Sequence, residues 1–134
     1  MTLVQSGRAT MEGYIAALTV RGPFADFFSD DVTLDVVSSG QTGQGRATVE
    51  GMIRWFHEQA FDARAELKSL VADDTRAALE ADFVGRHIGE FAGVPATGRD
   101  IRVPYSVHYD LDNGRIKALR IYGLTGDLVR ALTA

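Results

Sequence analysis

The sequence predicts an α+β fold in which three N-terminal helices cover a curved, mostly antiparallel sheet. The first half of the chain mixes helix-period and strand-like segments, whereas four strand-like segments follow one another in the second half. The last two of these are joined by the tight turn Asp112-Asn113-Gly114. Successive strands joined by short turns pair antiparallel, which excludes a βαβ arrangement. A length of 134 residues suits one domain over residues 1–134.

Helix-period spacing predicts two longer helices with a short one between them. The first covers about Gly7 to Val20, and Arg21-Gly22-Pro23 ends it. Pro23 suits the first turn of a short helix from Phe24 to Phe28. The second longer helix runs from about Ala47 to Ala60. Its core-facing stripe consists of Val49, Met52, Ile53 and Phe56.

The strand-like segments are recognised by β-branched residues or by alternation of apolar and polar side chains. They are Val32–Val37, Arg64–Val71, Thr75–Phe91, Arg102–Leu111 and Arg115–Gly123. Glycine-rich segments predict loops at Ser38–Gly45 and Gly93–Arg99, and Asp127–Leu132 predicts a closing helical turn. Pro104 predicts a bulge or an edge position in its strand. A curved sheet with helices on its concave side leaves a cone-shaped hollow.

The composition excludes several classes of function. A net charge of -4 without clustered Lys and Arg argues against nucleic acid as a partner. The chain has no cysteine, so thiolate chemistry and cysteine metal sites are excluded. Met1 to Thr10 lacks an apolar signal core, and no apolar run could span a bilayer. We therefore expect a cytoplasmic protein without a membrane partner and without a cofactor.

The strand Arg102–Leu111 has one polar and one apolar face, and the residues alone allow two orientations. The polar face holds Arg102, Ser106, His108 and Asp110, and the apolar face holds Ile101, Val103, Tyr105, Val107 and Tyr109. In one orientation the apolar face meets the helices and His108 lies in solvent. In the other, the polar face lines the hollow and the apolar face meets a partner subunit.

Several motifs resemble the SnoaL-like polyketide cyclases, a branch of the nuclear transport factor 2-like superfamily. Gly85-Arg86-His87-Ile88-Gly89 followed by Gly93-Val94-Pro95-Ala96-Thr97-Gly98 resembles a strand and loop typical of that branch. Asn113-Gly114-Arg115-Ile116 resembles the turn before its last strand. Gly13–Leu18 and Phe28–Leu34 resemble the wider superfamily, which includes ketosteroid isomerase. The resemblance covers nearly the whole chain and implies a cystatin-like α+β barrel with a pocket for a hydrophobic small molecule.

The resemblance implies that the polar face of Arg102–Leu111 looks into the pocket. His108 would then be the acid or base. Ser106 matches the position at which ketosteroid isomerase keeps an oxyanion donor, and Tyr14 matches its donor tyrosine. Tyr14 could equally be a core residue. The apolar face would form a two-fold interface through the convex side of the sheet, giving a homodimer.

Other residues are also candidates for the site. Asp35 lies one residue before the position of the isomerase base, so it could reach the pocket mouth or lie on the surface. His87 is expected to face inward and either bind a substrate carbonyl or hold the following loop. The remaining candidates for substrate binding are Trp55, Phe83 and Tyr122. His57 is expected to be exposed, and the three histidines show no metal-ligand spacing.

The chain departs in one respect from the cyclases that it resembles, and this difference bears on its function. They usually carry an acid/base aspartate at the end of the last strand, and the matching position here is near Ile121 or Leu124, neither of which titrates. The sequence therefore supports two hypotheses. One is an enzyme of acid–base chemistry, such as cyclisation or isomerisation, on a hydrophobic carbonyl compound. The other is a non-catalytic binding or dimerisation module of the same fold.

Overall fold

The computed structural model describes residues 6–134. Residues 1–5, the first half of the segment expected to lack an apolar signal core, lie outside it. Within the described part, one six-stranded sheet has the order β2-β1-β6-β5-β4-β3. Its strands are β1 (Phe28–Val36), β2 (Gln41–Gln44), β3 (Phe61–Ala72), β4 (Arg76–His87), β5 (Asp100–Asp112) and β6 (Arg115–Tyr122). Neighbours pair antiparallel except β1 and β6, which are parallel.

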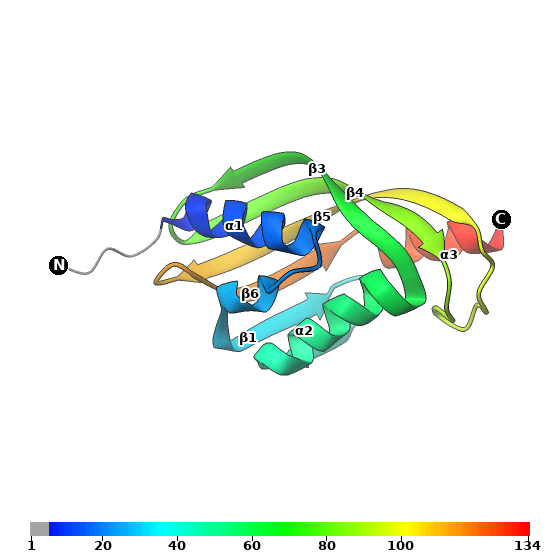
Figure 1. Ribbon diagram of the computed structural model, residues 1–134, viewed down its shortest axis with the longest axis horizontal. Helices are drawn as coiled ribbons and strands as arrows, with labels where there is room; N and C mark the ends of the chain where they lie inside the picture. The colour runs from blue at the N-terminus through cyan, green and yellow to red at the C-terminus, as the bar shows by residue number, and fades with distance from the viewer. Residues whose placement is uncertain (1–5) are drawn as a thin grey trace.

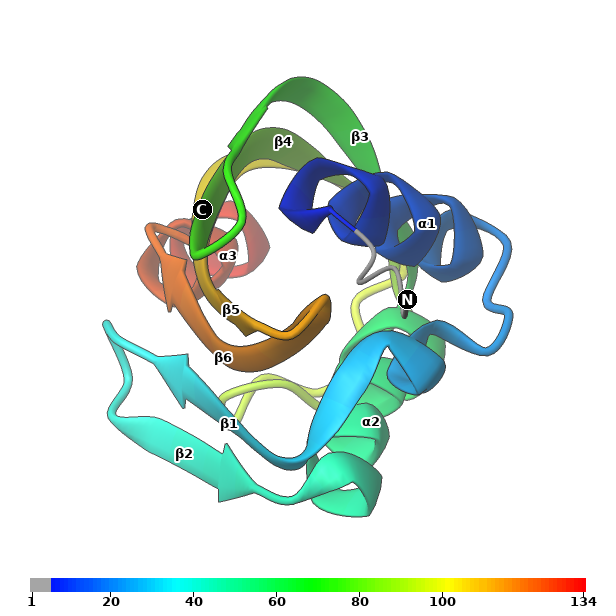
Figure 2. The same cartoon turned by 90° about the vertical axis from the view of Figure 1, so that its left-hand side faces the viewer.

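Helices lie across the open side of this sheet, as the sequence predicts for an α+β fold. They are α1 (Gly7–Thr19), the short 3₁₀ helix η1 (Phe24–Phe27), α2 (Arg46–Arg54), the π-helical turn η2 (Trp55–Ala60) and α3 (Thr125–Thr133). Seen end-on, the sheet curls in an arc from β3 round to β2, and α1 and α2 close the gap (Figure 2). Helix α3 packs at the end away from the N-terminus (Figure 1).

Local chemistry sets both ends of α1. The Ser6 hydroxyl accepts a hydrogen bond from the N–H of Ala9 at 3.1 Å, which caps the helix. The N–H of Gly7 donates to Asp74 Oδ1 at 2.9 Å, which ties the helix start to the β3–β4 turn. At the other end Arg21 adopts the left-handed conformation with φ 55° just before Pro23. The predicted break at these residues is therefore confirmed.

Irregularities in strand pairing let the sheet curl. The register shifts between Leu67 and Ser69 where β3 pairs with β4, and between Asp110 and Leu111 where β5 pairs with β6. Strand β6 pairs with β5 only from Ser106 onward, so at Pro104 strand β5 has a single neighbour, β4. The edge position predicted from Pro104 is present locally.

Strand β2 was not expected, because it lies inside the predicted loop Ser38–Gly45. It pairs antiparallel with β1, from Thr33 opposite Gln44 to Val36 opposite Gln41. Its polar, glycine-containing sequence lacks the usual marks of a strand, and backbone pairing with β1 stabilises it instead. Two other boundaries differ: β4 ends at His87 rather than Phe91, and the closing helical turn is the full helix α3.

The orientation adopted for β5 on the strength of the resemblance is wrong. Its apolar face looks inward: Ile101, Val103, Val107 and Tyr109 are buried, and Tyr105 and Val107 line the hollow. His108 is exposed on the outer, convex face. Burying a large apolar side chain contributes about 1.5–3 kcal/mol, so a row of five turns the strand toward the core of its own chain. The dimer interface predicted through this row is wrong for the same reason.

Two apolar clusters fill the inner side of the sheet. The larger lies under α1, η1 and α2 and includes Tyr14, Phe24 and Phe28. The second lies near α3 and includes Phe61 and Phe83. Packing is incomplete between the clusters, which leaves the hollow described next. Within residues 6–134 no helix is both long enough and apolar enough to cross a bilayer.

Candidate functional site

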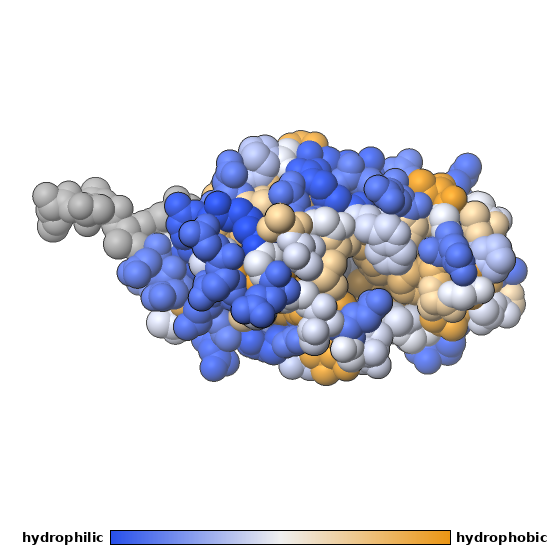
Figure 3. Space-filling view, turned by 90° about the horizontal axis from the view of Figure 1, so that it is seen from below, coloured by the Kyte–Doolittle hydropathy of each residue, from blue (hydrophilic) through white to orange (hydrophobic). Residues whose placement is uncertain are grey.

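An apolar hollow lies between the helices and the concave face of the sheet. Its wall takes side chains from α1, from the α2–η2 junction and from strands β3 to β6. Its volume is about 60 Å³, and it adjoins a second hollow of about 130 Å³ beside α2, β1 and β2. Both are lined by Ile53, Phe56, His57, Ile121 and Leu124. Figure 3 shows a recess with a hydrophobic floor on the face seen from below.

Three tyrosines bring hydroxyl groups into the first hollow. Tyr14 comes from α1, and Tyr105 and Tyr109 come from the inward face of β5. The rings of Tyr14 and Tyr109 meet edge to face with centroids 6.0 Å apart. Burial raises the pKa of all three hydroxyls above the ordinary value, so they stay protonated at neutral pH. They are hydrogen-bond donors in an apolar setting.

His57 also lines the first hollow. It lies in the π-helical turn η2, one helical turn after Ile53, and its Nδ1 lies 2.8 Å from the Ile53 carbonyl oxygen. A carbonyl oxygen can only accept, so Nδ1 carries the hydrogen and Nε2 keeps its lone pair. Nε2 is buried and has no hydrogen-bond partner in the described part of the chain. The ring therefore presents an unoccupied basic nitrogen.

The surroundings keep the His57 ring uncharged. Burial lowers its pKa, and the nearby Arg21 charge acts in the same direction. The hydrogen bond to Ile53 and the charge of Glu58 act in the opposite direction but are weaker than burial. At neutral pH the imidazole is thus a free base beside apolar walls and hydroxyl donors. An edge-to-face contact with Phe83, at 5.3 Å between centroids, holds the ring on the inner side.

The expected exposure of His57 is therefore wrong, and a signal in the sequence could have corrected it. His57 lies four residues after Ile53 and eight after Val49, both members of the apolar stripe. Continuing that stripe by one turn places the histidine on the buried face. The prediction of an exposed side chain gave more weight to the polar character of histidine than to its spacing in the helix. Single π-helical turns within helices are also frequent at functional sites.

The structure places only some of the predicted site residues at the hollow. Tyr14 and Phe83 line the first hollow, and Trp55 lies at the second, partly exposed and stacked on Phe91. The remaining candidates lie outside both hollows in the described structure: Asp35, His87, Ser106, His108 and Tyr122.

Four of the outlying candidates share the convex face with Arg120: Asp35, Ser106, His108 and Tyr122. The rings of His108 and Tyr122 meet edge to face at 5.2 Å. Arg120 forms two hydrogen bonds with Asp110, at 3.0 and 3.1 Å, and these bonds lower the pKa of that carboxyl group. Asp35 pairs in register with Arg120 across β1 and β6. The polar residues thus form a solvated sheet face, where His108 and Arg120 line an open groove of about 370 Å³ rather than the enclosed pocket that was predicted.

His87 secures the loop that follows β4. It is fully buried against Phe61, and its Nδ1 accepts a hydrogen bond from the N–H of Thr97 at 3.1 Å. The Thr97 hydroxyl lies 2.9 Å from the same nitrogen and accepts from the N–H of Arg99 at 3.2 Å. Of the two roles open to His87, this geometry favours holding the loop.

Replacing Thr97 by valine is expected to lower the free energy of unfolding by about 1–2 kcal/mol, because the buried His87 nitrogen loses a partner. The measurement is chemical denaturation followed by circular dichroism. Thr133→Val is the matched control, since that exposed hydroxyl bonds only to the Val129 carbonyl of its own helix. Equal stability of the two variants would contradict the role given to Thr97.

The described residues contain no group of three or more His, Cys, Asp or Glu side chains arranged to hold a metal ion. The first hollow is lined by one imidazole, that of His57, and by several residues that carry hydroxyl groups. A neutral imidazole takes up a proton, and a buried hydroxyl stabilises negative charge that develops on an oxygen nearby. Together they suit proton transfer on an uncharged molecule that bears an oxygen.

Comparison with known proteins agrees with this architecture. A family model for the SnoaL-like polyketide cyclases matches residues 17–123. None of the curated proteins matches the sequence. A presumed polyketide cyclase from Pseudomonas putida is 23% identical, with a TM-score of 0.79 over 93% of this chain and 96% of that one. A second from Xanthomonas campestris is 18% identical, with a TM-score of 0.82 over 94% and 96%.

Other similar structures carry different names. A presumed hydroxylase from Streptomyces galilaeus is 21% identical, with a TM-score of 0.76 over 93% of both chains. A presumed ketosteroid isomerase from Kribbella flavida is 22% identical, with a TM-score of 0.66 over 85% of this chain and 74% of that one. At these identities the likeness shows a shared fold, and the chemistry has to be argued from the hollow itself.

Proposed function

Because the chain belongs to the SnoaL-like polyketide cyclase family, we propose that it is an enzyme performing cofactor-free acid–base chemistry on a small hydrophobic carbonyl compound. The observation that supports this most is the lone pair of His57 Nε2. This nitrogen is buried without a hydrogen-bond partner in the described structure, on a side chain that lines both apolar hollows. An unpaired buried nitrogen is costly to maintain, and a bound molecule that donates to it would offset that cost.

His57 is proposed to be the base. Nε2 takes a proton from the carbon next to the substrate carbonyl, and the electron pair left behind moves onto the carbonyl oxygen. A hydroxyl of Tyr14, Tyr105 or Tyr109 donates to that oxygen as it becomes negative. In a β,γ-unsaturated ketone the electron pair returns through the double bond and His57 gives its proton to the γ-carbon, which isomerises the substrate. Alternatively the enolate carbon attacks a second carbonyl of the same molecule, and His57 gives its proton to the alkoxide that forms, which closes a ring.

This arrangement accounts for the missing aspartate. The positions matched to that residue, near Ile121 and Leu124, both line the two hollows, and both side chains are apolar. His57 lines the same two hollows. Under this proposal the base lies at the end of a helix rather than on the last strand.

The hydroxyl donors can be tested one at a time, because phenylalanine keeps the ring of each tyrosine. The probe is β-tetralone, an enolisable bicyclic ketone, whose α-hydrogens exchange with deuterium in D₂O and are followed by proton NMR. We expect at least one of Tyr14→Phe, Tyr105→Phe and Tyr109→Phe to slow enzyme-dependent exchange by roughly 100-fold. Thermal unfolding provides the folding control. Full exchange activity in all three variants would contradict the proposed role of the hydroxyls.

A non-catalytic binding module is the second candidate, favoured by the largely apolar lining of both hollows and by the apolar residues Ile121 and Leu124 at the positions matched to the aspartate. Trp55 is the only tryptophan in the chain and lies at the second hollow, so its fluorescence reports binding directly. Quenching by β-tetralone without acceleration of exchange would favour the binding module, whereas quenching with acceleration favours the enzyme.

A further inference from the structure

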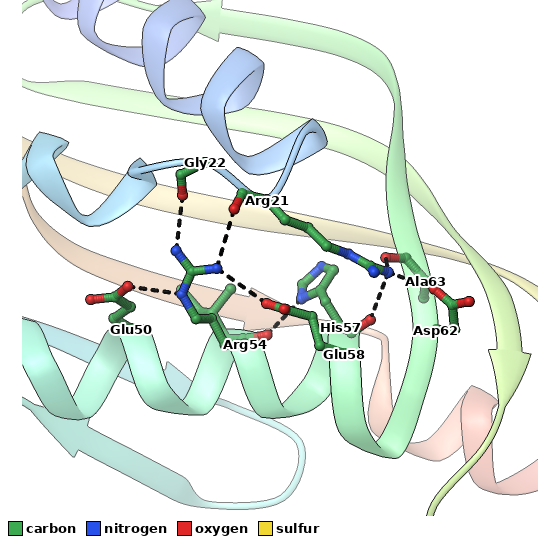
Figure 4. Close-up of polar contacts among 9 residues, drawn as sticks. Arg21, Gly22, Glu50, Arg54, His57, Glu58, Asp62 and Ala63 are labelled. Atoms are coloured by element: carbon green, nitrogen blue, oxygen red, sulfur yellow. Dashed lines mark hydrogen bonds and ion pairs between the residues drawn. The ribbon is translucent and has the colours of Figure 1, made fainter.

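Arg21 joins three parts of the chain around the turn that carries His57. Its Nη2 donates to the His57 carbonyl oxygen at 3.1 Å, to Asp62 Oδ1 at 2.7 Å and to the Ala63 carbonyl oxygen at 3.2 Å. Figure 4 shows the guanidinium beside β3, with the His57 ring between it and Arg54. The end of α1, the turn η2 and the start of β3 therefore meet at a single side chain.

Arg54 closes the other side of the same cluster, but its charge is well compensated. It pairs with Glu50 at 2.8 Å and with Glu58 at 3.2 Å, one helical turn away in each direction. Its Nη2 also donates to the Gly22 carbonyl oxygen at 2.9 Å. Arg21 by contrast has one carboxylate partner, Asp62, whose side chain is 66% exposed. The Arg21 charge is therefore screened less completely by its neighbours.

The charged groups around His57 act in opposite directions. Arg21, from the turn after α1, disfavours a second positive charge on the ring, and Glu58, from η2 itself, favours it. Asp62, from β3, offsets the charge of Arg21, and the two glutamates paired with Arg54 offset its charge. The tyrosines that face the hollow from α1 and β5 are uncharged at neutral pH.

We propose that Arg21 is a positioning residue that acts through His57. Its hydrogen bonds fix the turn that carries the imidazole, and its charge adds to the effect of burial in keeping the ring in the uncharged form that accepts a proton. Asp62 and Glu58 oppose that charge and set how strongly it acts. The consequence for turnover rests on the proposed function, whereas the electrostatic part concerns the ring alone and is measurable without a substrate.

The test is an NMR titration of the histidine side chains in the full chain, with the His57 signals assigned by their loss in His57→Gln. Arg21→Gln should raise the pKa of His57, because a positive charge is removed. Asp62→Asn and Glu58→Gln should lower it, because each removes a negative charge. Arg21→Lys keeps the charge and should restore much of the wild-type titration. Arg64→Gln is the matched control, since Arg64 pairs with Glu66 on an exposed part of β3.

The signs separate charge from simple loosening of the turn. If Arg21 and Asp62 only held the turn closed, either loss would admit water to the ring, and both variants would raise the pKa. That result, or the absence of a shift in all three charge variants, would overturn the proposal.

Enzyme activity provides a second test of the same proposal. A base must be unprotonated, so a raised His57 pKa moves the acidic limb of the kcat/KM profile to higher pH. For β-tetralone exchange, Arg21→Gln should be roughly two- to tenfold slower than wild type below that limb and unchanged above it. If the predicted titration signs appear while His57→Gln remains active, the proposed function fails and the electrostatic inference stands.

Discussion

Replacing His57 by glutamine is expected to slow β-tetralone exchange by about 10² to 10⁴-fold, the usual contribution of a general base. Glutamine is similar in size and polar, but its side chain cannot accept a proton at neutral pH. The variant should remain folded, because the buried Nε2 has no hydrogen-bond partner to lose in the described structure. The measurement is deuterium incorporation by proton NMR at pH 7 and 8, with thermal unfolding recorded in parallel.

The matched control is His108→Gln, which alters an exposed histidine on the convex face. It should exchange β-tetralone at the wild-type rate, because its ring lies outside both hollows. Loss of exchange in His108→Gln with full activity in His57→Gln would reverse the assignment. It would return the site to the polar face of β5.

Replacing Gly85 by alanine is expected to lower the free energy of unfolding by at least about 3 kcal/mol. A Cβ at this position would overlap the Asp62 carbonyl oxygen and lie 2.5 Å from Ala63 Cα. Both obstacles are backbone atoms of β3, so relief requires the two strands to separate. Asp62 and Ala63 are also the β3 partners of Arg21, so the clash would disturb the support of His57. Chemical denaturation measures the loss.

Gly51→Ala is the control for that experiment. Gly51 lies within α2, and a Cβ there meets nothing within 4 Å. Alanine has the better helix propensity, so this variant should gain about 0.5–1 kcal/mol. A Gly85→Ala variant as stable as wild type would show that β3 and β4 approach one another less closely than the structure indicates.

Apolar spacing and turn residues were sufficient to predict the order of elements and the fold class. The exception is β2, because Gln41–Gln44 is polar and contains Gly43, and only pairing with β1 makes it a strand. Such pairing depends on which segments meet in space, and a single sequence does not contain that information in its local pattern. The fold was thus predictable where side-chain periodicity decides it, and not where backbone pairing does.

The candidate site was only partly predictable. Alternation in β5 identified two faces correctly but did not say which one lies inside, and the resemblance to the cyclases led to the wrong choice. The competing physical rule, that a row such as Val103, Tyr105 and Val107 is buried before any histidine is, was the better guide. His57 was missed because residue type was given more weight than its position in the helical stripe. Tyr14 was placed correctly because its helix spacing and its match to the isomerase agreed.

The parallel pairing of β1 with β6 has a consequence for how the protein is made. Strand β6 lies between β1 and β5, so it is the only link between the two halves of the sheet in the described structure. Without Arg115–Tyr122 the other strands can pair only as a separate β2-β1 pair and a β5-β4-β3 sheet, each with an open edge. Closure of the sheet therefore depends on contacts between distant parts of the chain, which makes it a slow step of folding and one prone to aggregation.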